Sequence, residues 1–339
     1  MRAIYTILLT MMLTFNLSGC DADTPVKPVA EGTLEVHYID VGQADAALVL
    51  CGGESMLIDG GNVADSSLVV SYLAEHGVER LDYVVDTHAH EDHVGGLSGA
   101  LAKYGADRVY APVTEYDSKA FRDFVKYAGD LTVPSPGDAW TVGTAEVTVL
   151  GPVRTYDDTN NTSIVLRVDF GENSFLFTGD MERGAEADLL ESGADVKADV
   201  LKVGHHGSST STSYPFLREV MPEYAVISCE TGNSYGHPHE ETLSRLRDAD
   251  VTLYRTDMQG TVVATSDGKE ISFAVEKNPD AVTNSTNGSA EDYYIGNLNS
   301  QVFHRPSCSG LPAEQNQTKF DTREDALDAG YTPCGRCKP

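Results

Sequence analysis

The chain has little positive charge for its size. Its 339 residues include 24 Lys and Arg against 52 Asp and Glu, which gives a formal net charge of −28 and an isoelectric point near 4.5. A surface of this sign does not attract polyanions non-specifically, so general electrostatic binding of nucleic acid is excluded. No convincing internal repeat is present, which excludes a repeat architecture. The 41% hydrophobic content is enough for one large domain and one small domain.

Long apolar runs are also lacking, apart from Ala3 to Leu17, which is short for a stable transmembrane helix. This run follows Met1-Arg2 and ends in Leu17-Ser18-Gly19-Cys20, so residues 1–20 are typical of a secretory signal. The ending resembles a bacterial lipobox, which implies cleavage before Cys20, lipidation of its thiol and a membrane anchor outside the cytoplasm. The alternative is an ordinary signal peptide with an incidental cysteine. Residues 21–32 are expected to form a flexible tether.

Cysteine is scarce, and three of the six cysteines lie near the C-terminus. Cys51 and Cys229 end apolar runs and are expected to be small core residues, which could pair only if they lie adjacent in space. The last three join a histidine in the pattern H-x3-C … C-x2-C, formed by His304, Cys308, Cys334 and Cys337. This spacing predicts a tetrahedral structural zinc site, which would stabilise a segment too small for a large core. A disulfide is the alternative, but an odd count of three thiols favours zinc.

The densest group of metal-binding side chains is the run H-A-H-E-D-H, which contains His88, His90, Glu91, Asp92 and His93. It follows residues 81–87, an apolar and β-branched run typical of a strand. Imidazole and carboxylate suit Zn, Mn or Fe, and such sites activate water when a coordination position stays open. Further candidates follow other strand-like runs beside glycine-containing turns: Asp59, Asp180, His205 and His206. We expect loops at the strand ends to bring them together.

This set resembles the metallo-β-lactamase superfamily over residues 33–275. The resemblance implies an α/β fold of the αββα sandwich type with two divalent metals, Zn or Mn, in the active site. It implies that His88 and His90 bind one metal, that Asp92 and His93 bind the other, and that Asp180 bridges them. One of His205 and His206 should be a further ligand, and His205 is narrowly favoured. Asp59 is expected to orient a ligand histidine, or else to form a turn before Gly60-Gly61.

Five collinear stretches narrow the resemblance to the ComEC competence-protein subgroup. They are D-V-G-Q-A-D-A at 40–46, N-N-T-S-I-V-L at 160–166, L-K-V-G-H-H-G-S at 201–208, Y-G-H-P-H at 235–239 and T-D-M-Q-G-T at 256–261. Ala44 departs from a glycine of the subgroup. The membrane-spanning channel of full-length competence proteins is absent, so DNA uptake itself is not implied.

Asn160 and Asn161 stand where lactamases and glyoxalases carry a metal-binding histidine. An amide is a poorer metal ligand and could hydrogen-bond a phosphate oxygen instead. His237 is expected to donate a proton to a leaving alkoxide or to contact the transferred phosphate, unless it is only a surface residue. The expected substrate contacts are Asn160, Asn161, His206, Ser208 and His239. For Ser208 an ST-rich turn is the equal alternative, and Lys202 either offsets phosphate charge or flanks a strand.

The C-terminal segment 292–339, after a polar linker at 276–291, resembles the zinc-binding domain of the Ada DNA-repair protein. The resemblance implies a zinc-stapled α+β module. His304 replaces the first cysteine of that family, which is its methyl acceptor, so methyl transfer is not expected.

The chain is therefore expected to be a surface-anchored, metal-dependent phosphodiesterase or nuclease acting on extracellular DNA, with unknown protein partners. A second hypothesis is a phosphorylcholine- or teichoic-acid-type esterase of the cell envelope, which the acidity slightly favours. The third is a non-catalytic lipoprotein that binds nucleic acid or cell wall.

Overall fold

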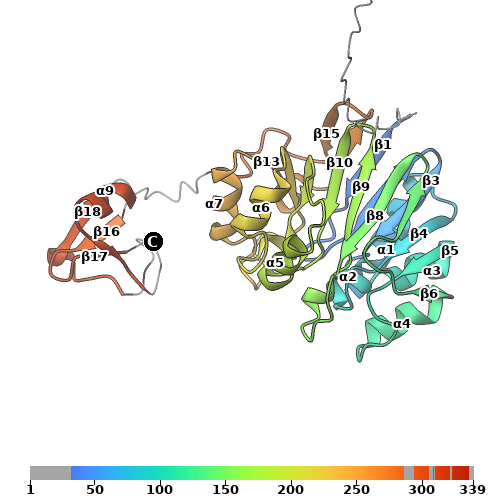
Figure 1. Cartoon of the computed structure of the whole chain (residues 1–339), viewed down its shortest axis with the longest axis horizontal. Coiled ribbons are helices and arrows are strands. Elements are labelled where there is room, and N and C mark those ends of the chain that lie inside the picture. Colours follow the sequence, from blue (N-terminus) through green and yellow to red (C-terminus); the bar gives the residue numbers. More distant parts are fainter. Residues whose placement is uncertain (1–31, 286–293, 305–307, 309, 321–322, 336–339) are drawn as a thin grey trace, which may run out of the picture.

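The computed structural model describes residues 32–285, 294–304, 308, 310–320 and 323–335. Two β-sheets face each other, and helices cover their outer faces (Figure 1). This is the expected αββα sandwich. The segment 1–20, with Cys20, and the last ligand candidate Cys337 lie outside the described residues. Within the described part of the chain, no helix is both long enough and apolar enough to span a membrane.

The first sheet has the strand order β15-β14-β1-β2-β3-β4-β5-β6. Its strands are β1 (Leu34–Tyr38), β2 (Ala47–Cys51), β3 (Glu54–Ile58), β4 (Leu81–Val85), β5 (Ala106–Tyr110), β6 (Leu131–Thr132), β14 (Val262–Ser266) and β15 (Ile271–Val275). Its helices are α1 (Ser66–Glu75), α2 (Glu91–Val94), α3 (Leu97–Tyr104) and α4 (Lys119–Ala128). The pairing is antiparallel from β15 to β3 and parallel from β3 to β6, where helices make the crossovers.

The second sheet has the order β13-β12-β11-β10-β9-β8-β7. Its strands are β7 (Ala139–Val142), β8 (Ala145–Gly151), β9 (Val165–Phe170), β10 (Asn173–Phe177), β11 (Val200–Lys202), β12 (Tyr224–Ile227) and β13 (Thr252–Arg255). Its helices are α5 (Arg183–Glu191), α6 (Tyr214–Val220) and α7 (Glu240–Asp248), and the short α8 (Thr256–Gln259) follows β13. Strands β10 to β13 run parallel.

Three apolar layers hold the sandwich together. Val36, Ile58, Phe175 and Val200 belong to the layer between the sheets. A second layer packs α1, α3 and α4 on the first sheet, and a third packs α5, α6 and α7 on the second. Each fully buried large apolar side chain contributes roughly 1.5–3 kcal/mol. Cys51 and Cys229 are buried free thiols in different layers, so they are core residues and do not pair.

The polar segment expected to begin a linker at residue 276 is held against the αββα sandwich over its first part. The backbone N–H of Lys277 donates to the Gln259 carbonyl at 2.9 Å, and Asn278 Nδ2 donates to the Met258 carbonyl at 2.8 Å. The Thr283 hydroxyl donates to the Leu253 carbonyl. Hydrogen bonds to α8 and β13 therefore order residues that composition alone indicates as a linker.

The C-terminal module contains a small sheet of order β18-β16-β17-β19. Its elements are β16 (Tyr294–Asn297), β17 (Val302–His304), β18 (Gln317–Phe320), α9 (Arg323–Asp328) and β19 (Thr332–Pro333). Phe303 is buried in this module, and Tyr294 packs edge-on against it. The module is thus of the expected α+β type.

Candidate active site

The site lies where strands of both sheets end. The histidine-rich loop follows β4, Asp59 follows β3, Asp180 follows β10, and the pair His205 and His206 follows β11. Because β3 and β4 are parallel, and β10 and β11 are parallel, each pair of loops leaves its sheet at one edge. Asp59, His205 and His206 have positive φ angles of 58°, 52° and 52°. Such angles are uncommon for non-glycine residues and concentrate at functional sites.

Two groups of ligand atoms share His93, and Asp180 lies close to both. His88, His93 and Asp180 form one group, and Asp92, His93 and His206 form the other, each with ligand atoms within 4.8 Å of one another. Asp180 Oδ1 lies 3.2 Å from His93 Nε2, and Asp180 Oδ2 lies 3.8 Å from both His88 Nε2 and His206 Nε2. His90 joins the first group, because its Nδ1 is 3.0 Å from His88 Nε2. Asp180 thus lies within 4 Å of histidines from both groups.

The structure favours His206 as the metal ligand, whereas the sequence narrowly favoured His205. His206 is buried, and its Nε2 lies 3.3 Å from Asp92 Oδ2. His205 is partly exposed, and its Nδ1 turns toward Glu182 at 3.5 Å. The geometry therefore favours His206 as the ligand, because its imidazole lies between the carboxylates of both groups. His205 lies on the pocket wall, with its Nε2 3.6 Å from Asp180.

Asp59 lies where it can orient a ligand, as expected. Its Oδ2 accepts a 2.8 Å hydrogen bond from His93 Nδ1. Thr87 donates to the same carboxylate through its backbone N–H at 2.7 Å and its hydroxyl at 2.8 Å. These contacts leave His93 Nε2 directed at Asp180. Carboxylates behind ligand histidines fix the ring and its tautomer.

Asp45 and Lys202 form a buried ion pair behind the site, which the sequence reasoning missed. Lys202 Nζ donates to Asp45 Oδ2 at 2.8 Å, and the two side chains are 5% and 7% exposed. Lys202 is therefore unable to offset phosphate charge in the pocket. Asp45 Oδ1 lies 3.4 Å from His206 Nδ1, which donates to the Ser228 carbonyl at 3.1 Å. Burial alone would raise the pKa of Asp45, but Lys202 and His206 hold it below its usual value.

A pocket of about 330 Å³ opens over the ligand groups. It is lined by Gln43, His90, Glu91, Asp92, Asn160, Asp180, His205, His206, Tyr235 and His237. Of the expected substrate contacts, Asn160 and His206 line it, as does the expected catalytic residue His237. The other three expected contacts do not line it.

Each of those three contacts is engaged elsewhere. Asn161 accepts from the Glu182 N–H at 3.0 Å. His239 accepts from the Ser209 N–H at 2.9 Å. Ser208 is buried beside Thr210, with their hydroxyls 3.0 Å apart, as in the ST-rich turn that was its alternative. Gln43 was missed, although it belongs to the D-V-G-Q-A-D-A stretch.

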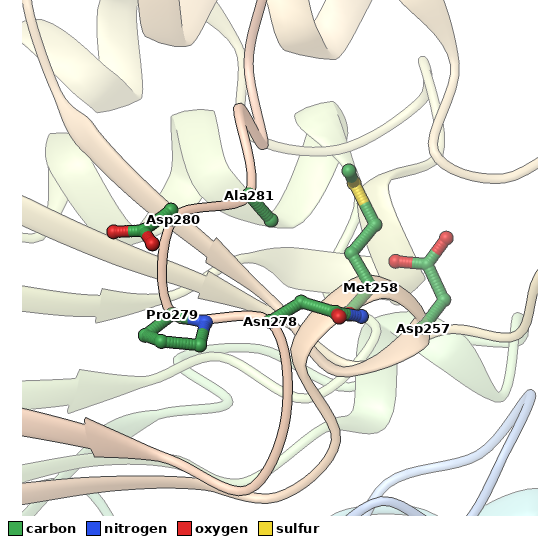
Figure 2. A pocket seen from close by; sticks show the side chains of 6 residues that line it. All are labelled: Asp257, Met258, Asn278, Pro279, Asp280 and Ala281. Atoms are coloured by element: carbon green, nitrogen blue, oxygen red, sulfur yellow. The ribbon is translucent and has the colours of Figure 1, made fainter.

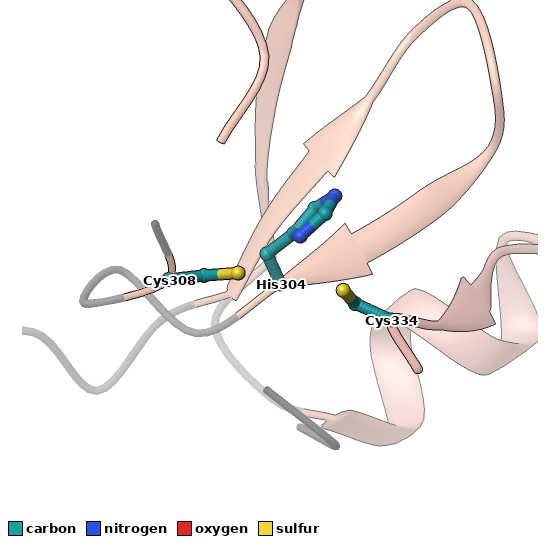
Figure 3. Close-up of side chains that lie close together, drawn as sticks. All are labelled: His304, Cys308 and Cys334. Carbon is teal, nitrogen blue, oxygen red and sulfur yellow. The ribbon is translucent and has the colours of Figure 1, made fainter. Parts of the chain in front are cut away.

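His304, Cys308 and Cys334 come together in the C-terminal module (Figure 3). Their ligand atoms lie within 4.8 Å of one another, at the end of β17 and just after β19. No disulfide joins Cys308 to Cys334, so the disulfide alternative does not apply to this pair. His304 Nδ1 is buried without a hydrogen-bond partner in the described part of the chain. Three convergent ligands and an unsatisfied imidazole nitrogen fit a structural zinc ion.

A second hollow, of about 730 Å³, lies between α8 and residues 278–281 (Figure 2). Asp257, Met258, Asn278, Pro279, Asp280 and Ala281 line it. It contains none of the histidines, and Arg255 neutralises Asp257 at 2.7 Å. This hollow is therefore separate from the metal-ligand groups.

Comparison with known proteins agrees with this geometry. The family model of the metallo-β-lactamase superfamily matches residues 39–231. The chain belongs to this superfamily. The model of the metal binding domain of Ada matches residues 278–339, so the zinc-module resemblance is confirmed as well. The match begins before the expected boundary at residue 292.

Competence proteins are among the relatives of this metallo-β-lactamase domain. The chain is 30% identical over 260 residues to ComE operon protein 3 of Bacillus subtilis, covering 70% of this chain and 34% of the relative. It is 35% identical over 239 residues to Competence protein ComA of Neisseria gonorrhoeae, covering 70% and 33%. The chain thus spans about a third of the length of these relatives. The metallo-β-lactamase fold protein YhfI from Bacillus subtilis is 15% identical, with a TM-score of 0.49, covering 70% of this chain and 100% of that one.

The side chains present fit the divalent metals that the superfamily implies. His93 Nε2, Asp180 Oδ1 and His206 Nε2 are buried without hydrogen-bond partners among the described residues. Unsatisfied buried groups of this kind are costly unless they bind an ion. Burial alone would raise the pKa of Asp180, but His93 and His206 hold it well below its usual value. The carboxylate is therefore ionised, which is the form that a metal ligand takes.

Proposed function

We propose that this protein is an extracytoplasmic, metal-dependent phosphodiesterase that cleaves DNA. The main support is the pair of ligand groups that share His93 and lie close to Asp180, beneath an open pocket whose wall carries the amide of Asn160. An amide on that wall suits a phosphate oxygen better than it suits a metal. The competence proteins among the relatives support a DNA-related substrate.

In the proposed assignment, His88, His90 and Asp180 would hold one metal, and Asp92, His93 and His206 would hold the other. His93 and Asp180 lie close to both groups, so Asp180 could serve as a shared ligand. When bound, such ions polarise a phosphodiester and supply hydroxide at neutral pH. The chain itself contributes orientation, because Asp59 holds the His93 ring and Asp45 lies behind His206. Asn160 and His237 face the space where the phosphate would lie.

The proposed location follows from the signal-like segment 1–20 and Cys20, which would carry the lipid. The C-terminal module would hold one structural zinc through His304, Cys308, Cys334 and Cys337. Lipid at Cys20 can be detected by mass spectrometry of the mature N-terminus. An unmodified N-terminus, or a free Cys20 thiol, would contradict the anchor.

One observation favours a second candidate, a cell-envelope phosphoesterase of the phosphorylcholine or teichoic-acid type. The pocket lining contains no Lys or Arg, and Glu91 lies at its exposed rim. A long polyanion gains nothing from such a rim, whereas a substrate with a positive group near its phosphate would be attracted to Glu91.

A substrate panel separates these candidates. The protein, loaded with Mn or Zn, is tested on single-stranded DNA, bis-p-nitrophenyl phosphate and p-nitrophenyl phosphorylcholine. Asp180→Asn serves as the inactive variant and His76→Ala as the matched histidine control, since His76 lies exposed beside α1. If the unaltered protein cleaves DNA and the Asp180→Asn variant does not, the first proposal is supported. If the protein hydrolyses only the choline ester, the second candidate is supported and the first is refuted. If no substrate is hydrolysed with metals bound, both are refuted.

A further inference from the structure

Gln43 and His237 meet on the pocket wall, although they are 194 positions apart in the sequence. Gln43 lies in the bend between β1 and β2, and His237 lies in the loop before α7. Gln43 Nε2 is 3.3 Å from His237 Nδ1. On its other side, Gln43 Oε1 accepts the backbone N–H of Glu230 at 3.3 Å. The amide thus bridges a main-chain group and the imidazole.

This arrangement fixes which nitrogen of His237 carries the proton. A backbone N–H can only donate, so the atom of Gln43 that faces Glu230 must be the carbonyl oxygen. The amide nitrogen then faces His237, and an amide nitrogen also only donates. His237 Nδ1 must therefore accept, which leaves it without a proton. The imidazole is neutral and carries its hydrogen on Nε2.

Threonine hydroxyls fix the main chain at both ends of this bridge. The Asp40 N–H donates to the Thr261 hydroxyl at 3.1 Å, which fixes the start of the bend that carries Gln43. The Cys229 N–H donates to the Thr256 hydroxyl at 3.0 Å, next to Glu230. The two threonines of the T-D-M-Q-G-T stretch thus hold the segments that meet at Gln43.

The loop that carries His237 is also fixed. Asn233 Oδ1 accepts the His237 N–H at 3.1 Å, and Asn233 Nδ2 donates to the His237 carbonyl at 2.5 Å. Within the described part of the chain, no hydrogen bond engages His237 Nε2. The N–H group of this pocket-lining ring therefore remains available to a bound molecule.

We infer that Gln43 is a positioning residue that keeps His237 as a neutral Nε2–H donor to a phosphate oxygen of the substrate. His237 then does not protonate the leaving group, because loss of the Nε2 proton from a neutral ring would leave an imidazolate. Of the two roles expected for His237, contact to the phosphate is the one this geometry supports. The identity of the acceptor rests on the proposed phosphodiesterase function, whereas the protonation of the ring does not.

Nitrogen-15 NMR of the full chain, labelled at histidine, tests the protonation directly. The His237 signals are identified by their loss in His237→Asn. We expect an unprotonated Nδ1 and a protonated Nε2 at neutral pH. Gln43→Glu keeps the size but replaces the amide donor with a carboxylate acceptor, so it should place a proton on Nδ1. A protonated Nδ1 in the unaltered protein, or no change in Gln43→Glu, would overturn the inference.

Leaving-group dependence tests the role. A hydrogen bond to a charged oxygen contributes about 10- to 100-fold to the rate. His237→Ala should therefore lower kcat/KM by a similar factor for a p-nitrophenyl ester and for a dinucleotide with an alkoxide leaving group. Gln43→Met should show a smaller loss with the same pattern. A loss that is much larger for the dinucleotide would identify a proton donor and refute this role. If the unaltered protein cleaves neither substrate, the proposed function fails, and the NMR result alone then decides how Gln43 positions His237.

Discussion

Replacement of Lys202 by methionine is the sharpest test of how the site is built. The ammonium of Lys202 is the cation that faces the buried carboxylate of Asp45, at 2.8 Å. Methionine keeps the length of the side chain and removes its charge. Asp45 Oδ1 has no hydrogen-bond partner among the described residues, so the carboxylate depends on Lys202 for its compensation.

The expected loss of stability is large. Breaking a buried ion pair by removing one partner costs about 3–5 kcal/mol, because the remaining charge is left uncompensated. Part of this cost is offset here, because the N–H at His206 Nδ1 lies 3.4 Å from Asp45 and stabilises the negative charge of its carboxylate. We therefore expect about 3 kcal/mol for Lys202→Met. For a domain of this size, that corresponds to a drop in Tm of roughly 6–12 °C.

The assay uses the single tryptophan of the chain. Trp140 lies on β7, and its ring stacks on Tyr110 and Tyr83 against the layer between the sheets. Its fluorescence therefore follows unfolding of the hydrolase domain and not of the C-terminal module. Urea unfolding of metal-free protein gives the free energy of unfolding without a contribution from bound ions.

A double-mutant cycle supplies the control. Asp45→Asn combined with Lys202→Met removes both charges, so the double variant should be more stable than the sum of the single losses predicts. A loss below about 1 kcal/mol for Lys202→Met, or strictly additive losses, would show that the pair is not a compensated buried ion pair.

The remaining predictions concern the metal sites. His206→Ala should lose about one equivalent of active-site metal by elemental analysis while His205→Ala retains it, and the reverse pattern would restore the sequence-based preference. Asp59→Asn should weaken metal affinity about 10- to 100-fold in chelator competition, because the ligand ring behind it loses its orienting carboxylate; unchanged affinity would limit Asp59 to a turn. Cys334→Ala should release about one zinc and leave the Trp140 unfolding midpoint in place, whereas a shifted midpoint would mean that the two domains unfold together.

The sequence allowed much of the fold to be predicted because its strands are short apolar runs that end at glycine-containing turns. The apolar run at 81–87, predicted to be a strand, contains β4, and the strand-like runs predicted before Asp59, Asp180 and the His205-His206 pair appear as β3, β10 and β11. Helix α4 was missed, although Phe121 and Phe124 are buried on one face and Ser118 caps its start. The signal was present, since apolar residues recur there at helical spacing.

The sequence alone could not decide which of His205 and His206 is the metal ligand. Adjacent residues point in different directions, and the direction of each depends on the backbone. Here both have φ angles near +52°, in a tight turn after β11 that places His206 inward. The same limit applied to Lys202. A lysine at the end of a strand is predicted to be exposed, and its buried partner Asp45 comes from a distant loop.

The charges around the site explain why this arrangement needs cations. Asp92 and Asp180 belong to the two ligand groups, and Asp45 and Asp59 form a further buried cluster with His93. Lys202 faces Asp45 and is the one ammonium paired with these four carboxylates within the described residues. Desolvated charge of one sign costs several kcal/mol per ion unless it is compensated. With neutral imidazoles the group keeps an excess of negative charge, and two divalent ions would more than compensate it. The positive charge that remains would favour the anionic phosphodiester that we propose as the substrate. A pocket without lysine or arginine can therefore still select a phosphate, because the attraction comes from the ions beneath it.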